Sequence, residues 1–209
     1  MTKLRAFPDG EKIHNTRMYH EYHDLGMEDG WLPNNQQDNF HFMTKLMELT
    51  GIPLPGTHCL DVGCGSGDLS LFLRQRGISS YLGVDIYDIS LEKARNKYPQ
   101  ETFLHTDILS EDLQQMFDYA FCSGSLTVKF KTIDNYDFLS AMIEKMWELT
   151  RIGLVFNVLT DDDTLPDPDL FFYSQEKVQK ICQKIIGKSN NLFVEKTPNI
   201  CQIHVYLWR

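Results

Sequence analysis

Glycine and aspartate at regular spacing give residues 59–69 the clearest potential for chemistry. The stretch reads Cys-Leu-Asp-Val-Gly-Cys-Gly-Ser-Gly-Asp-Leu, so an apolar run ends on Asp61 and glycine then stands at positions 63, 65 and 67. Glycine has no Cβ, so the backbone can turn sharply and a ligand can approach the main chain closely. A helix that begins after such a loop points unpaired backbone N–H groups at the ligand. The pattern indicates a site for a nucleotide-like cofactor.

The spacing of the glycines bears on which cofactor this is. A dinucleotide-binding fingerprint, G-x-G-x-x-G, would have its third glycine at position 68, where the chain has Asp68. Carboxylates at Asp68 and Asp61 would repel a pyrophosphate. S-adenosylmethionine (AdoMet) carries an ammonium and a sulfonium and only one carboxylate, so Asp61 would attract it. The loop therefore favours AdoMet over NAD.

At these residues the chain resembles the class I AdoMet-dependent methyltransferases, whose first motif is an acidic residue followed by G-x-G-x-G after the first strand. Weaker similarities to small, poorly characterised bacterial members are Gly30-Trp31 ahead of Gln36-Gln37, the run from Ser123 to Lys129, and the ending His204-Val-Tyr-Leu-Trp-Arg209. Thr127 stands where that group has Asn. The resemblance implies an enzyme that converts AdoMet to S-adenosylhomocysteine (AdoHcy), and it does not identify the methyl acceptor.

Three further apolar runs end on acidic or small residues, at 80–85, 102–107 and 117–124. Asp85 follows Gly63 by about 22 residues, the distance that a βαβ unit needs, and an acidic residue there accepts hydrogen bonds from ribose hydroxyls. The resemblance implies that Asp107 binds the adenine amino group. A loop or helix-cap role is the alternative for each acid. The expected cofactor-binding residues are Asp61, Gly63, Cys64, Gly65, Gly67, Asp85, Ile86, Asp107, Ile108 and Ser123.

Strands that alternate with amphipathic segments predict the elements that hold these residues. They indicate an α/β fold with a Rossmann-like, doubly wound, mostly parallel sheet. Helices are expected at 36–49, 69–76, 90–97, 135–150 and after Ser174, and a fifth strand at 152–160. Residues 192–196 and 201–208 predict a C-terminal antiparallel hairpin, which NAD-type domains usually lack. We expect one domain over 1–209, with an N-terminal helical extension at 1–55 that contains a candidate lid and a core at 56–209.

The composition of the chain indicates which kinds of binding partner and which cellular compartment to expect. A net charge of −9 argues against nucleic acid, which needs clustered Lys and Arg, and favours a small-molecule substrate. The five cysteines are scattered without a Cys-x-x-Cys pair, which indicates free thiols, no zinc site and a reducing compartment. The N-terminus does not read as a secretory signal, and no run is long enough for a membrane span. We expect a cytoplasmic protein without a metal, and the sequence leaves the oligomeric state open.

Methyl transfer from a sulfonium is an in-line displacement that alignment of the reactants can accelerate. A general base is needed only for an acceptor that is protonated at working pH, so no catalytic residue is assigned. Trp31 could contact the sulfonium by cation–π attraction or anchor the extension to the core. The alternatives are an NAD-dependent oxidoreductase and a non-catalytic AdoMet-binding module. The candidates for contact with the acceptor are Tyr19, Tyr22, His23, Trp31 and Lys129.

Overall fold

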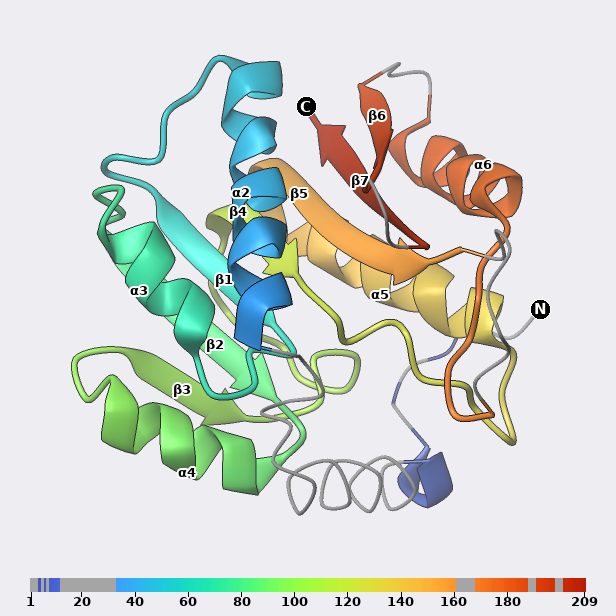
Figure 1. Ribbon diagram of the computed structural model, residues 1–209, viewed down its shortest axis with the longest axis horizontal. Coiled ribbons are helices and arrows are strands. Elements are labelled where there is room, and N and C mark those ends of the chain that lie inside the picture. The colour runs from blue at the N-terminus through green and yellow to red at the C-terminus, as the bar shows by residue number, and fades with distance from the viewer. Residues whose placement is uncertain are drawn as a thin grey trace.

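A seven-stranded sheet with helices on both faces forms the centre of the structure, a computed structural model (Figure 1). It describes residues 4, 6, 8–11, 33–160, 168–187, 191–197 and 201–209. The strands are β1 (His58–Val62), β2 (Ser80–Asp85), β3 (Thr102–His105), β4 (Phe117–Cys122), β5 (Thr150–Leu159), β6 (Leu192–Lys196) and β7 (Gln202–Trp208). The helices are α2 (Pro33–Thr50), α3 (Asp68–Arg74), α4 (Asp88–Lys97), α5 (Asn135–Leu149) and α6 (Gln175–Ile186).

The strands follow the order β3-β2-β1-β4-β5-β7-β6. The first five pair in parallel, whereas β7 pairs antiparallel with β5 on one side and β6 on the other. The predicted Rossmann-like sheet and its C-terminal antiparallel hairpin are confirmed. The alternation of residue types in β7 does not correspond to one solvent-exposed and one buried face, because every residue from 202 to 207 is buried.

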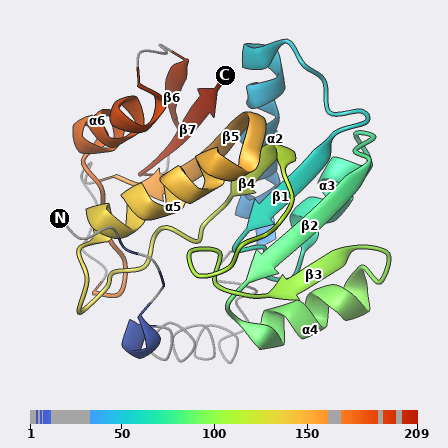
Figure 2. The same cartoon turned by 180° about the vertical axis from the view of Figure 1, so that it is seen from behind.

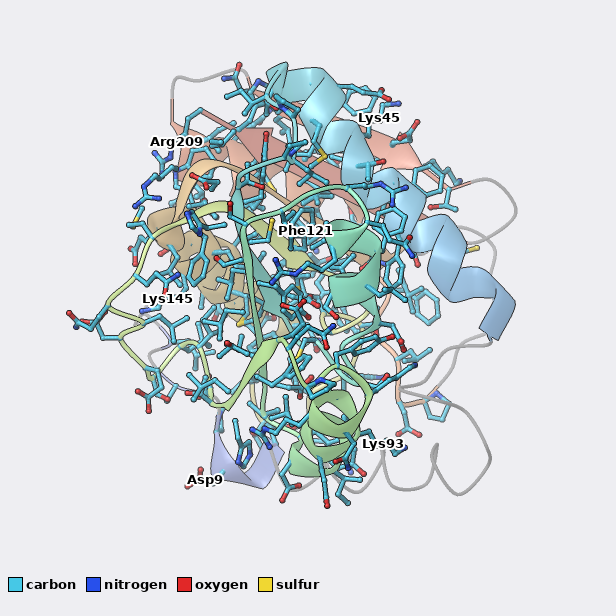
Figure 3. All side chains as sticks on the ribbon, turned by 90° about the vertical axis from the view of Figure 1, so that its left-hand side faces the viewer. Asp9, Lys45, Lys93, Phe121, Lys145 and Arg209 are labelled. Atoms are coloured by element: carbon cyan, nitrogen blue, oxygen red, sulfur yellow. The ribbon has the colours of Figure 1, made fainter. Side chains whose placement is uncertain are left out.

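Alternating side chains of the strands supply two hydrophobic layers, one on each face of the sheet. Leu60 and Ala120 pack with residues of α5 and α6, whereas Cys59, Tyr119 and Phe121 pack with residues of α2, α3 and α4. Phe121 is fully buried, and Figure 3 labels it near the centre of the view. Because neighbouring residues of a strand point to opposite faces, Asp61 lies on the α2 and α3 side of β1.

Local signals account for where the helices begin and end. The Asp134 carboxylate accepts hydrogen bonds from the N–H groups of Tyr136 and Asp137 at 2.8 and 3.1 Å, so α5 starts with a capped first turn. Gly187 follows α6 with a φ of 67°, a conformation that favours glycine. The helix expected at 69–76 spans Asp68–Arg74, and the one expected at 36–49 spans Pro33–Thr50.

Part of the predicted N-terminal extension is outside the described residues, and so are four candidates for contact with the acceptor: Tyr19, Tyr22, His23 and Trp31. Residues 9–11 form a helical turn. Figure 2 shows this turn, in blue, below the N-terminal end of α5. Within the described part of the chain, no helix has both the length and the apolar character to cross a bilayer.

Candidate functional site

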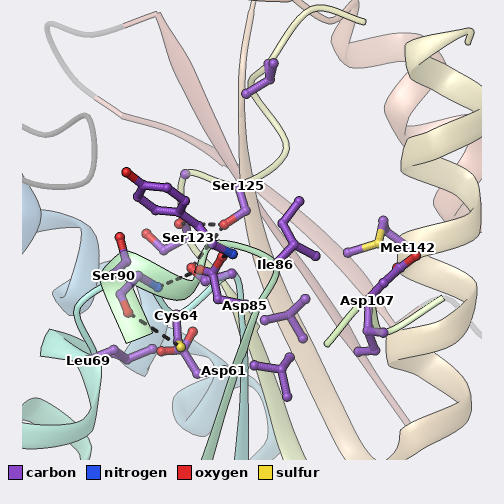
Figure 4. A pocket seen from close by; sticks show the side chains of 18 of the residues that line it. Asp61, Cys64, Leu69, Asp85, Ile86, Ser90, Asp107, Ser123, Ser125 and Met142 are labelled. Atoms are coloured by element: carbon purple, nitrogen blue, oxygen red, sulfur yellow. Dashed lines mark hydrogen bonds between the residues drawn. The ribbon is translucent and has the colours of Figure 1, made fainter. Parts of the chain in front are cut away.

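A pocket lies at the carboxyl ends of β1, β2 and β4 and includes the turn after β3 (Figure 4). This is the edge where open α/β sheets bind ligands. Nine of the ten residues expected to bind the cofactor line it: Asp61, Gly63, Cys64, Gly65, Asp85, Ile86, Asp107, Ile108 and Ser123. The topology therefore brings these nine residues together although the first and last of them, Asp61 and Ser123, are 62 positions apart in the sequence.

The three glycines of the loop have different roles. Gly63 has a φ of 70°, and a Cβ on it would lie 1.8 Å from Ser125 Oγ, so the loop after β4 packs directly on this residue. Gly65, with a φ of 52°, also lines the pocket. Gly67 does not line it: a Cβ there would lie 2.7 Å from the Phe103 ring, so this glycine allows α3 to approach β3.

Asp85 joins the glycine loop to the turn after β2. Its Oδ2 accepts a hydrogen bond from Gly65 N at 2.8 Å, and its Oδ1 accepts one from Tyr87 N at 2.9 Å. These two bonds, one to each carboxylate oxygen, fix the orientation of the group. The carboxylate is thereby held at the wall of the pocket.

Asp61 is a buried acid at the wall of the pocket. Asp61 is 2% exposed, and its Oδ2 accepts a hydrogen bond from the Tyr81 hydroxyl at 2.6 Å. Burial raises the pKa of Asp61 to about 7; the Tyr81 hydrogen bond lowers this pKa, and the nearby charge of Asp85 raises it further. A cation in the pocket would favour the ionised form of Asp61.

Asp68 also borders the pocket, but its charge is already paired. Its Oδ1 accepts hydrogen bonds from Lys97 Nζ and the Tyr98 hydroxyl, both at 2.5 Å, and its Oδ2 accepts one from Ser66 Oγ at 3.0 Å. Repulsion of a pyrophosphate by Asp68 is therefore weaker than the sequence suggested. The antiparallel β7 is the stronger structural argument against an NAD-type domain.

The end of the pocket near Asp107 is apolar. Asp107 Oδ1 accepts a hydrogen bond from Leu109 N at 3.0 Å, and Met142 of α5 lines the same pocket (Figure 4). The rings of Phe130 and Phe138 meet edge to face, with centroids 4.6 Å apart, and both line the pocket. An apolar wall next to a hydrogen-bonding carboxylate suits a flat heterocycle with an amino group.

Several lining residues were not identified from the sequence. Phe138 and Met142 were expected only as core residues of a helix; they belong to the core and also face the pocket. Helical periodicity gives no signal that separates these two situations. Others that line the pocket are Phe40, Leu69, Tyr87, Ser90, Thr106, Gly124, Ser125, Val128 and Phe130.

Lys129 is the one candidate for contact with the acceptor that the structure describes. Its side chain is exposed and does not line the pocket, whereas its neighbours Val128 and Phe130 do. The backbone N–H of Lys129 donates to the Asp169 carbonyl at 2.8 Å, which fixes this alternation. Within the described ranges, no three His, Cys, Asp or Glu side chains gather as metal ligands would.

Residues 59–150 match the family model described as a methyltransferase domain. Among curated proteins, an O-methyltransferase of Pyrenophora dematioidea is 26% identical over 145 residues, which are 66% of this chain and 54% of that protein. The mitochondrial ubiquinone biosynthesis O-methyltransferase of Bos taurus is 32% identical over 132 residues, 62% of this chain and 31% of that protein. The chain thus spans about half, or less, of the length of these curated relatives.

Solved structures agree with the family match. The magnesium protoporphyrin IX methyltransferase of Synechocystis PCC 6803, crystallised with bound AdoMet, has a TM-score of 0.63 at 19% identity and covers 83% of this chain and 79% of its own. An AdoMet-dependent methyltransferase of Clostridium acetobutylicum has a TM-score of 0.63 at 14% identity over 93% and 98% of the two chains. The predicted fold, that of the class I AdoMet-dependent methyltransferases, is confirmed.

Proposed function

We propose that this chain, whose residues 59–150 match the model of a methyltransferase domain, is an AdoMet-dependent methyltransferase that acts on a small-molecule acceptor by in-line displacement. The observation that carries the proposal is the pocket, in which Asp61, Asp85 and Asp107 surround a glycine loop at the carboxyl edge of the sheet. The family match and the fold support the same function.

The residues of the pocket fit the chemical groups of AdoMet, which would supply a methyl group activated by its sulfonium. Asp61 would pair with the ammonium, because a buried carboxylate with a raised pKa gains most from a cation. Asp85 would accept from the ribose hydroxyls. Asp107 would accept from the adenine amino group, and Ile86 and Ile108 would contact the ring.

The expected role of this chain is to align the reactants and exclude water. Among the described residues that line the pocket there is no His, Lys or Arg. Transfer from a sulfonium needs no covalent intermediate, so alignment can supply much of the acceleration. A small-molecule acceptor is supported by the net charge of −9 and by the magnesium protoporphyrin IX in the name of a structural neighbour. Contact of Tyr19, Tyr22, His23 or Trp31 with the acceptor stays a prediction.

Calorimetry with AdoMet and AdoHcy tests the cofactor assignment. Wild-type protein should bind both, and Asp85→Asn should weaken AdoHcy binding by about 30-fold, since hydrogen bonds to a charged group contribute about 2 kcal/mol. Asp88→Asn is the matched control, because Asp88 is an exposed carboxylate in the first turn of α4 and does not line the pocket. It should bind AdoHcy like the wild type.

Two other outcomes would select the alternatives. Binding of NAD without binding of AdoMet or AdoHcy would indicate an oxidoreductase. Tight AdoMet binding without methyl transfer to any member of a broad acceptor screen would indicate a non-catalytic module. A structure with bound AdoHcy would then show which side chains face the acceptor.

We also propose that the chain is one domain over residues 1–209 that acts in the cytoplasm. None of the five cysteines forms a disulfide, and four of them are buried, as expected where thiols stay reduced. Limited proteolysis would test the single domain: resistance of 33–160 with loss of the rest as separate fragments would contradict it. Light scattering would give the oligomeric state.

A further inference from the structure

A buried carboxylate near the start of the chain contacts the loop that follows β4. Glu11 is 1% exposed. Its Oε1 accepts hydrogen bonds from Lys131 N at 2.9 Å, from Thr132 N at 2.5 Å and from Thr132 Oγ1 at 2.6 Å. The two segments are about 120 positions apart in the sequence, so one side chain joins the N-terminal segment to a distant loop.

The same loop is held from two other directions. Lys129 N donates to the Asp169 carbonyl at 2.8 Å. Phe130 N donates to Asn135 Oδ1 at 3.2 Å, and Asn135 Nδ2 donates to the Val128 carbonyl at 2.7 Å. Consecutive backbone N–H groups from 129 to 132 therefore have acceptors, and Glu11 supplies the acceptor for the last two.

This loop forms part of the pocket. Val128 and Phe130 line the pocket, and the Phe130 ring packs on Phe138 with the centroids 4.6 Å apart. Glu11 binds the backbone one and two positions after Phe130. A shift of the loop at these positions would move the Phe130 ring and change the apolar wall of the pocket.

The contact is expected to be strong. A buried carboxylate is stable only when donors compensate its lost hydration, and hydrogen bonds to an ionised acceptor are about twice as strong as neutral ones. Removal of the Glu11 carboxylate would leave two partly buried backbone N–H groups and a hydroxyl without this acceptor.

We propose that Glu11 is a positioning residue of the pocket: it holds the loop at 128–132 so that Val128 and Phe130 form the wall against which the cofactor packs. The inference rests on the proposed function. Glu11 does not line the pocket itself and acts through the loop.

Two measurements on the full chain test the proposal: hydrogen exchange of the amides at 129–132 without ligand, and the affinity for AdoHcy by calorimetry. Glu11→Ala should speed exchange at 131–132 and weaken AdoHcy binding by about tenfold, because the Phe130 ring would no longer be held at the pocket wall. Glu11→Gln keeps an oxygen acceptor without the charge and should give a smaller change in both measurements. Asp9→Ala is the matched control, because Asp9 is an exposed carboxylate on the same segment.

A double-mutant cycle separates positioning from general stability. Phe130→Ala should weaken AdoHcy binding, and Glu11→Ala should add little to it if both act through the same wall. Additive losses, or a lower melting temperature with unchanged AdoHcy affinity in both Glu11 variants, would overturn the proposal. Unchanged exchange at 131–132 in Glu11→Gln and Glu11→Ala would also overturn it. Failure of wild-type protein to bind AdoHcy would instead reject the proposed function, while exchange still decides whether Glu11 holds the loop.

Discussion

The pocket and the C-terminal hairpin each bury an ionisable side chain, and the two side chains differ in whether a ligand can reach them. Asp61 is 2% exposed and borders an open pocket with Asp85 nearby. His204 is fully buried in β7, where its Nδ1 lies 3.0 Å from Thr197 Oγ1 and its ring stacks on Phe42 at 4.5 Å between centroids. Burial disfavours the charged form in both cases.

Asp61 and His204 differ in whether a ligand could favour the charged form of the side chain. Burial lowers the pKa of His204 to about 4, and its partners Thr197 and Gln202 are neutral, so the ring contributes structure as an uncharged group. Burial raises the pKa of Asp61 to about 7 at a wall that a ligand can reach. A buried ionisable group that borders a pocket is a candidate for function, whereas a buried group that stays uncharged inside the sheet is a candidate for stability.

The two groups also give opposite dependences of stability on pH. For Asp61 the folded pKa lies above the unfolded value of 3.8, so between about pH 4 and pH 7 its contribution falls as pH rises. For His204 the folded pKa lies below the unfolded value of 6.5, so its contribution falls as pH drops from 6.5 toward 4.

The largest effect on binding is expected from Gly63→Ala. Its φ of 70° disfavours any Cβ, and the new methyl would meet Ser125 Oγ at 1.8 Å, so the loops at both sides of the pocket must separate. AdoHcy affinity measured by calorimetry should fall by more than about 100-fold, which is about 2.7 kcal/mol. Gly56→Ala is the control, because Gly56 has a φ of 85° with nothing within 4 Å of its Cβ position. Near-normal affinity in Gly63→Ala would place the ligand elsewhere.

Asp61→Asn is expected to weaken AdoHcy binding and to raise the stability of the ligand-free protein. The amide oxygen can still accept from the Tyr81 hydroxyl, but the charge is lost. AdoHcy affinity should fall by about 30-fold, since a hydrogen bond to a charged group is typically about 2 kcal/mol. The ligand-free variant should melt at a higher temperature than the wild type at pH 8, where ionised Asp61 is unfavourable. A lower melting temperature at pH 8 would contradict the burial of an uncompensated charge.

The pH dependence of binding should follow Asp61. A bound ammonium favours the ionised form, so affinity should be highest above pH 7 and decrease below it. With a free-protein pKa of about 7, AdoHcy binding should weaken by about tenfold from pH 8 to pH 6. Calorimetry of AdoHcy binding to the wild type and to Asp61→Asn between pH 6 and pH 8 measures this pH dependence. The variant should lose most of the dependence; the same slope in both proteins would assign it to another group.

His204→Phe should have the smallest effect on binding. Phe keeps a ring against Phe42 but removes both ring nitrogens, which lie within hydrogen-bond distance of Thr197 and Gln202. We expect a loss of about 2 kcal/mol in stability at pH 7.5 and AdoHcy affinity within about twofold of wild type. The stability gap to wild type should narrow as pH falls from 6.5 toward 4 in urea titrations, because the wild type gains a proton at His204 on unfolding and the variant lacks this group.

The parts of the fold and site that the sequence predicted are those with local patterns. The glycine loop and Asp85 lie within one βαβ unit, so their spacing alone indicates that they meet. The strand pattern of β6 and β7 likewise predicted a hairpin. Alternation could not show that β7 would be inserted between two strands, or that Phe42 of α2 would cover the His204 ring.

The parts that it missed depend on contacts between distant segments. Ser125 packs on Gly63, and Glu11 binds the loop after β4, without any recurring spacing between the partners. Phe138 and Met142 follow the periodicity of an ordinary core helix, although the pocket reaches them. Lys129 stood out as a charged residue after a strand, yet the register of the loop turns its two neighbours inward.

The position of β7 in the sheet has a consequence for the nascent chain. All described residues that line the pocket lie at or before Met142, so the ribosome releases them well before the hairpin. β6 leaves the ribosome before β7, the strand that attaches it to the sheet, and β5 keeps an unpaired edge until then. The nascent chain therefore cannot complete its sheet before residues 202–208 have been made, and until then β5 presents an edge to which another strand could pair.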